Sequence, residues 1–169
     1  MTNDVFTPEE AFSLSNPRAV AYLMEHGAEL ITGIDETTRA AIHDILVQAM
    51  QEGWSYDTTA KAIREQFPEF AVGTPYEHVR SRAHLVAIDE SANAYGEADL
   101  QQSLEMQARG MDMEKFWLVT GGDICEDCLA NAEQGWIPVD EPFSSGHMRY
   151  PAHTACRCSM LTRRVGAGA

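Results

Sequence analysis

The spacing of hydrophobic residues in the first part of the chain is typical of amphipathic helices. Apolar positions recur at intervals of three and four through three segments, which predicts helices over 18–31, 32–53 and 55–67. Gly53 is the expected C-cap of the second helix. Its buried stripe is predicted to consist of Ile34, Ile42, Ile45, Leu46, Ala49 and Met50. We therefore expect the chain to begin with a helical region.

A longer helix is predicted over residues 76–110. It is expected to start at Thr74 as the N-cap, with Pro75 at the first helical position and a glutamate soon after, a combination typical of helix starts. Gly110 is expected to end it. Gly96 interrupts this helix, and an interior glycine predicts either a kink or close packing against another segment.

The pattern changes after residue 110. Short apolar segments predict strands over 115–120, 136–139 and 157–163, with about two helical turns after Cys128. A loop rich in proline, glycine and serine precedes the last strand. We expect an α+β fold, in which an N-terminal helical region with one long helix is followed by a small three-stranded antiparallel module that carries every cysteine.

Charge and composition limit the function. The 169 residues include 26 acidic and 12 basic side chains, a formal net charge of −14. Phosphate binding rests on lysine and arginine, so this charge argues against general DNA binding and favours a basic protein partner. No segment approaches the roughly 18–20 apolar residues of a membrane span. The N-terminus lacks the basic and apolar regions of a secretory signal, so we expect a reducing compartment, where clustered cysteines are more often metal ligands than disulfides.

The four cysteines lie in two clusters with the spacing of metal ligands. Cys125 and Cys128 form a C-x2-C knuckle, and after 24 intervening residues come His153, Cys156 and Cys158. A structural zinc ion takes four nitrogen or sulfur ligands, so five candidates compete for four places. Cys125 and Cys128 are the firm pair. His153 and Cys156 have a familiar x2 spacing and can complete the set. Cys158 can also replace one of them. Since alternation along a strand points Cys156 and Cys158 the same way, a third arrangement has both cysteines bound and His153 outside.

Two alternatives to a metal site are a pair of disulfides and four unrelated thiols. A structural Zn²⁺ ion would clamp a module that buries little apolar surface, and it contributes on the order of 10–16 kcal/mol in small domains. A catalytic ion needs an open site, whereas five candidate ligands favour a closed one. The motif order of zinc deaminases and an H-E-x-x-H sequence are both missing. We therefore expect a structural ion and no catalytic residue.

The predicted organisation follows from these segments. We interpret the chain as an extended arm, a helical region, a cysteine-rich β module with the zinc site (a zinc-knuckle module) and a flexible tail. Their expected bounds are 1–16, 17–110, 111–162 and 163–169.

Other polar and aromatic residues give weaker indications of function. Asp89 and Glu90 are neighbours on a predicted helix, so they cannot face each other as an acid/base pair. His147 lies in a loop and is expected to be solvated, and Trp117 is expected to pack in the core. Three histidines of predicted helices are expected to be exposed or half-buried: His43, His78 and His84.

Several residues occur in an order that resembles a known family. RAHLVAIDE over 82–90 is followed by Ala94 and Gly96, and later by the C-x2-C pair and PAHTACRC over 151–158. Between them lie Phe116, Trp117, Asp123, Pro142 and Phe143. This combination resembles the C-terminal domain of phage Mu F-like minor head proteins, the phage head morphogenesis family. The resemblance covers about residues 17–162. Tyr150 and Asp89 depart from it, because the family often has proline and threonine there.

The resemblance implies a virion structural protein rather than an enzyme. It would be a minor head protein of a tailed phage or prophage-like particle, acting in head morphogenesis at or near the portal. Its expected partners are the portal protein and other head proteins, with at most weak DNA contact and no membrane. Its expected location is the interior of the head near the portal, and the host cytoplasm during assembly. The alternatives are a toxin-like or nuclease effector enzyme carried in the phage head, and a regulatory zinc-binding module.

Overall fold

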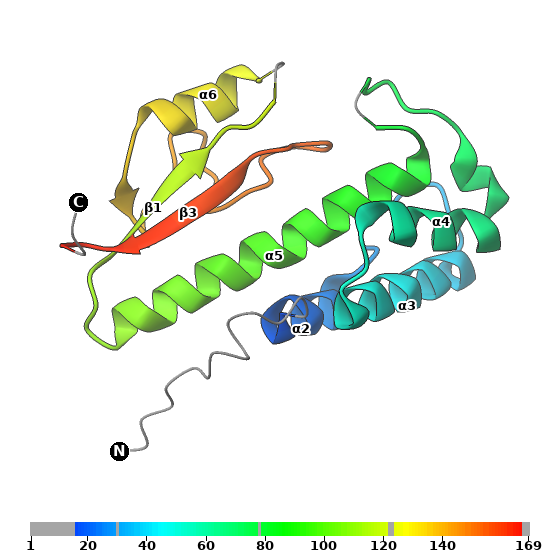
Figure 1. The fold of residues 1–169 in the computed structure, drawn as a ribbon, viewed down its shortest axis with the longest axis horizontal. Coiled ribbons are helices and arrows are strands. Elements are labelled where there is room, and N and C mark those ends of the chain that lie inside the picture. Colours follow the sequence, from blue (N-terminus) through cyan, green and yellow to red (C-terminus); the bar gives the residue numbers. More distant parts are fainter. Residues whose placement is uncertain (1–15, 30, 78, 122–123, 167–169) are drawn as a thin grey trace.

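The computed structural model describes residues 16–166 except 30, 78 and 122–123 (Figure 1). The arm expected over 1–16 therefore falls almost wholly outside the described residues, as do His78, Asp123 and the last three residues of the expected tail. The helices of the first part are α2 (Pro17–His26), α3 (Glu36–Glu52), α4 (Tyr56–Gln66), the 3-10 helix η1 (Pro68–Ala71) and α5 (Arg82–Ala108). The second part contains β1 (Met113–Leu118), α6 (Glu126–Glu133), β2 (Ile137–Pro138) and β3 (Ser159–Arg164).

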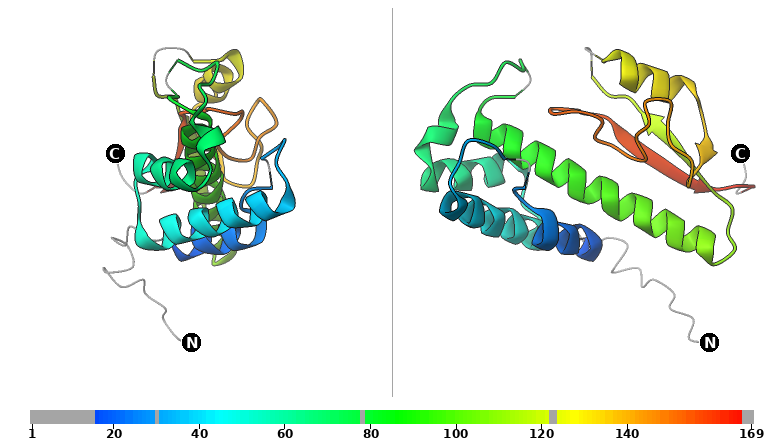
Figure 2. Two further views of the ribbon diagram at one scale, coloured as in Figure 1. Left: turned by 90° about the vertical axis from the view of Figure 1, so that its right-hand side faces the viewer. Right: turned by 180° about the vertical axis from the view of Figure 1, so that it is seen from behind.

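The expected α+β fold is confirmed, and α5 lies at its centre. Figures 1 and 2 show the sheet and α6 on one side of α5, with α2, α3 and α4 on the other. Within the described residues, none of the helices has both the length and the apolar composition that crossing a membrane requires.

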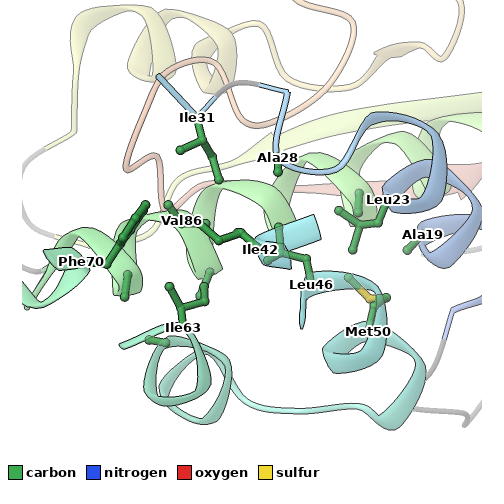
Figure 3. Packing of buried hydrophobic residues seen from close by; sticks show 14 of the residues in the cluster. Ala19, Leu23, Ala28, Ile31, Ile42, Leu46, Met50, Ile63, Phe70 and Val86 are labelled. Atoms are coloured by element: carbon green, nitrogen blue, oxygen red, sulfur yellow. The ribbon is translucent and has the colours of Figure 1, made fainter. Parts of the chain in front are cut away.

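The helical layer is held by an apolar core against one side of α5 (Figure 3). The helices α2, α3 and α4 each start at a polar N-cap whose side chain accepts backbone N–H groups, as Asp35 does for α3 and Ser55 for α4. Gly53 ends α3 in the left-handed conformation, as expected. The core includes Leu23, Ile42, Leu46, Ile63, Phe70 and Val86, all buried.

The predicted start of the long helix at Thr74 is wrong. The Thr74 hydroxyl donates to the backbone oxygen of Val79, at 3.0 Å, and so closes a loop instead of capping a helix. Ser81 is the actual N-cap, and its Oγ accepts the N–H of His84 at 3.2 Å. Thr74 and Pro75 therefore form part of a turn, and Ser81, seven residues after Thr74, starts α5.

The second core lies between α5 and the sheet. The strand order is β2-β1-β3 with both pairings antiparallel, and β1 pairs along its whole length with β3, from Met113 opposite Arg164 to Leu118 opposite Ser159. Trp117 is fully buried and meets the ring of Phe143 edge-on at 5.0 Å, which confirms its expected core role. β3 continues two residues into the segment that we expected to be the tail.

Gly96 provides close packing, and α5 runs through it without interruption. A Cβ atom placed on Gly96 would lie 2.1 Å from the backbone oxygen of Tyr150. Two side chains of α5 that closely follow this glycine hold the loop around Tyr150. Arg149 Nε donates to Glu97 Oε2 at 2.7 Å, and the Tyr150 hydroxyl donates to Asp99 Oδ2 at 3.1 Å. The chain between β2 and β3 is therefore placed directly on the long helix.

Candidate metal centre

The C-x2-C pair forms the start of α6. Cys125 is the N-cap of this helix, and its Sγ accepts the backbone N–H of Cys128 at 3.3 Å. Cys128 is buried and Cys125 is half-buried. A thiol at the N-cap and another in the first turn point to the same side of the chain, so the local helix start brings both sulfurs together.

The second group lies in a tight turn before β3. The N–H of Cys156 donates to the backbone oxygen of His153 at 3.1 Å, and Ala155 between them has a left-handed φ of 60°. β3 begins only at Ser159, so the strand expected over 157–163 starts two residues later. Strand alternation is therefore not what directs Cys156 and Cys158 to one side; the turn does so instead.

The two groups meet around Cys128. The Sγ of Cys128 lies 3.8 Å from the Sγ of Cys156 and 3.7 Å from Nε2 of His153. Two sets of donor atoms each lie within 4.8 Å of one another and share Cys128: one is completed by Cys125 and His153, the other by Cys156 and Cys158. The fold thus brings together all five residues singled out in the sequence.

These separations fit a metal centre and not a disulfide. Two thiolates bound to one tetrahedral zinc ion at about 2.3 Å lie about 3.8 Å apart, which matches the distance between Cys128 and Cys156. A disulfide requires about 2.05 Å, and all four cysteines are free thiols. The sulfur and nitrogen donors are those that zinc prefers, so the cluster can hold a metal ion.

His153 is oriented to offer a nitrogen lone pair to the cluster. Its Nδ1 lies 2.8 Å from the backbone oxygen of Thr154, so Nδ1 carries the proton and donates it. Nε2 is then left unprotonated and faces Cys128. Metal-binding histidines commonly donate their second ring nitrogen to a carbonyl group in this way. The ring is exposed, so His153 lies at the outer side of the centre.

Burial keeps the inner thiols protonated when no cation is present. It raises the pKa of Cys128, with the Cys125 and Cys156 sulfurs adding to the effect, and it raises the pKa of Cys156. A divalent ion reverses this preference because the thiolate is the ligand, so binding releases protons. Cys128 and Cys156 are therefore neutral thiols without a cation and become thiolates when one binds.

The centre borders a cavity of about 280 Å³ on its outer side. Cys125, His153 and Arg157 line one wall, and Tyr76 and Glu77 from the loop before α5 contribute to the other. The candidate ligands therefore lie where the helical layer meets the sheet, and not at a remote tip of the module.

Glu90 is a buried carboxyl group, at a position where helical spacing places it on the same face as Val86 and Ala94. It is 4% exposed, in the middle of α5, and its carboxylate accepts the backbone N–H of Ala28. Burial raises its pKa to about 7, with the negative charges of Asp89 and Glu29 adding to the rise. Above this pH the folded protein must keep a poorly solvated charge.

Replacing Glu90 by glutamine is expected to stabilise the protein at high pH. Since the folded pKa lies above the unfolded one, Glu90 lowers the free energy of unfolding progressively as pH rises from about 4.5 to about 7. At pH 8 we expect Glu90→Gln to be more stable than the parent by roughly 1–3 kcal/mol, and at pH 5 nearly equal to it. Urea unfolding at both pH values measures this, with Glu65→Gln on the exposed face of α4 as the control. A variant less stable than the parent at pH 8 would refute the assignment.

Lys115 is a second buried charge that the sequence analysis missed. Its Nζ donates to the backbone oxygen of Met148 at 2.7 Å and lies 4.9 Å from the centre of the Phe143 ring. Burial lowers its pKa to about 8. Alternation along β1 could have revealed it, since Lys115 shares the inward side with Met113 and Trp117. It fixes the loop between β2 and β3 and lies apart from the cysteines.

Three other histidines, His43, His84 and His147, lie away from the cysteines in sequence and form hydrogen bonds of their own. His43 is half-buried, as expected, with Nε2 3.2 Å from the oxygen of Met24. The expectation was wrong for His84, which is buried. Its Nδ1 accepts the backbone N–H of Arg80. The expectation was also wrong for His147, which is half-buried and lies 3.0 Å from the Ser145 hydroxyl in a tight turn.

Fold and site together define an α+β protein in which a cysteine- and histidine-rich module, able to hold a metal ion, is mounted on a long helix. The family model described as Phage Mu protein F like protein matches residues 40–161, so the chain belongs to this family. No curated protein and no solved structure matches the chain. Family membership confirms the resemblance seen in the motifs, and it indicates a phage head morphogenesis protein associated with the virion and with other head proteins.

Proposed function

We propose that the chain is a structural minor head protein that acts at or near the portal of a tailed phage or prophage-like particle. The family match over 40–161 supports the role in the head. The observation that carries the mechanism is the meeting of two donor groups, separated by 24 residues, around the Sγ of Cys128. In this proposal the protein works by binding other head proteins and not by turnover.

Zinc is the proposed ion, and its role is to clamp the module. Four of Cys125, Cys128, His153, Cys156 and Cys158 would hold it, with Cys128 common to both donor sets. A bound zinc ion supplies a cross-link between the start of α6 and the turn before β3. The module between them has one short strand of two residues and a small core. The metal would add on the order of 10–16 kcal/mol to what this core contributes.

With the clamp in place, the helical layer and the cysteine-rich module would form one rigid body, because both pack against α5. The loop at Arg149 and Tyr150, which precedes the turn that carries His153, lies on α5 at Gly96, Glu97 and Asp99. A partner that contacts the helical layer would therefore meet a module in a fixed orientation. The formal charge of −14 suits a partner with a basic surface and limits any DNA contact to a weak one.

The role at the portal is tested by binding. We expect the purified chain to elute together with the portal protein of the same particle in size-exclusion chromatography. The complex should weaken as salt is raised, because an acidic surface contributes to it. In assembled particles, electron cryomicroscopy should place the chain at the portal vertex inside the head. A chain that elutes alone at every ratio tested, and is missing from purified heads, would contradict the proposal.

A further inference from the structure

The turn that carries two candidate ligands is held by a side chain of α5. Ala155 lies between His153 and Cys156, and its φ of 60° is a left-handed conformation that L-residues other than glycine adopt only at a cost in free energy. A turn of this kind persists when its surroundings fix it. The N–H of Ala155 donates to Oδ1 of Asp89 at 2.8 Å, across 66 residues of sequence.

Asp89 has no role in its own helix that would explain this contact. It lies two turns inside α5, and the N-cap of that helix is Ser81. Its carboxylate faces the turn, and it lines the cavity of about 420 Å³ beside Pro151, Ala152 and His153. Hydrogen bonds to charged acceptors are stronger than those between neutral groups. The carboxylate is thus suited to hold a strained N–H in place.

We propose that Asp89 is a positioning residue of the metal centre: by holding the Ala155 N–H it sets the turn in which His153 and Cys156 both reach Cys128. The inference rests on the proposed zinc centre. It also gives α5 a direct part in metal binding, because the helix fixes the geometry of the second donor group. Residues that orient metal ligands from outside typically change metal affinity by 10–100-fold when they are replaced.

The test is zinc affinity, measured by competition with a chromophoric chelator, together with the absorption spectrum of the cobalt-substituted protein. Asp89→Ala should weaken zinc binding by about 10–100-fold and alter the cobalt bands, whereas Asp89→Asn, which keeps an oxygen acceptor, should lose less. Asp99→Ala is the matched control, since Asp99 is another α5 aspartate that holds the same loop at Tyr150. It should leave the zinc affinity unchanged.

A second variant separates positioning from a general loss of folding. Glycine adopts the left-handed conformation without the cost that alanine has, so Ala155→Gly should restore part of the affinity lost in Asp89→Ala. If the parent chain binds one zinc ion and Asp89→Ala binds it equally well, the role of Asp89 is overturned and the metal centre stands. If the parent chain binds no metal, the proposed metal centre and the role of Asp89 are both overturned. Equal losses in Asp89→Ala and Asp99→Ala without rescue by glycine would also overturn the inference.

Discussion

Replacing Cys128 by serine is expected to remove the bound metal and to unfold residues 113–164, while α2, α3 and α4 remain folded. Cys128 is the thiol that both donor sets share, so its loss leaves neither set complete. A metal contribution on the order of 10 kcal/mol is comparable to the whole net stability of a typical domain. The helical layer has its own core and does not depend on the module's interior.

Hydrogen exchange detected by mass spectrometry measures the protection of the backbone amides in each segment and so tests this prediction. Amides of β1 and β3 should lose protection in Cys128→Ser, and those of α3 should keep it. The emission of Trp117, fully buried in the parent, should shift to the red. Asp127→Asn, an exposed neighbour on α6, is the matched control and should behave like the parent. A Cys128→Ser protein with a protected sheet would show that no metal clamps the module.

Gly96→Ala is expected to destabilise the protein by about 3 kcal/mol, although glycine to alanine within a helix normally stabilises by about 1 kcal/mol. The added Cβ would lie 2.1 Å from the oxygen of Tyr150 and 3.2 Å from its carbonyl carbon. Both are backbone atoms, so no flexible side chain can move away. The loop and its contacts with Glu97 and Asp99 must shift instead.

The free energy of unfolding in urea is the measurement for this variant. Gly73→Ala is the matched control, because a Cβ there would meet nothing within 4 Å, and it should stay within about 0.5 kcal/mol of the parent. A Gly96→Ala protein as stable as the parent would mean that Tyr150 does not rest on α5 in solution.

The sequence predicted the fold class because the elements are locally encoded. The apolar stripe of α3 and its C-cap Gly53 are properties of one segment. The structure confirms Gly53 and buries Ile42, Leu46, Ala49 and Met50 of the expected stripe, whereas Ile34 precedes α3 and Ile45 is half-buried. The start of α5 was mistaken because Thr74 and Ser81 both carry local start signals, and only the tertiary structure uses Thr74 to close a turn. The boundary expected between residues 110 and 111 stays a prediction.

The composition of the candidate site was also predictable, but its arrangement was not. Spacing identified the five candidate donors, because a C-x2-C pair lets two thiolates reach one ion from a single tight turn. It could not show that a turn, and not strand alternation, directs Cys156 and Cys158. The role of Asp89 was beyond reach, since its partner lies 66 residues away. The buried charge of Lys115 was missed, although alternation along β1 places this residue on the inward side.

X-ray absorption at the zinc edge, on protein purified without added metal, tests the central claim most directly. A shared ion held by the two donor groups predicts one zinc per chain. It further predicts three or four sulfur neighbours at about 2.3 Å and at most one nitrogen at about 2.0 Å. A chain that carries no metal and has four titratable thiols, or a zinc ion surrounded only by oxygen and nitrogen, would contradict it.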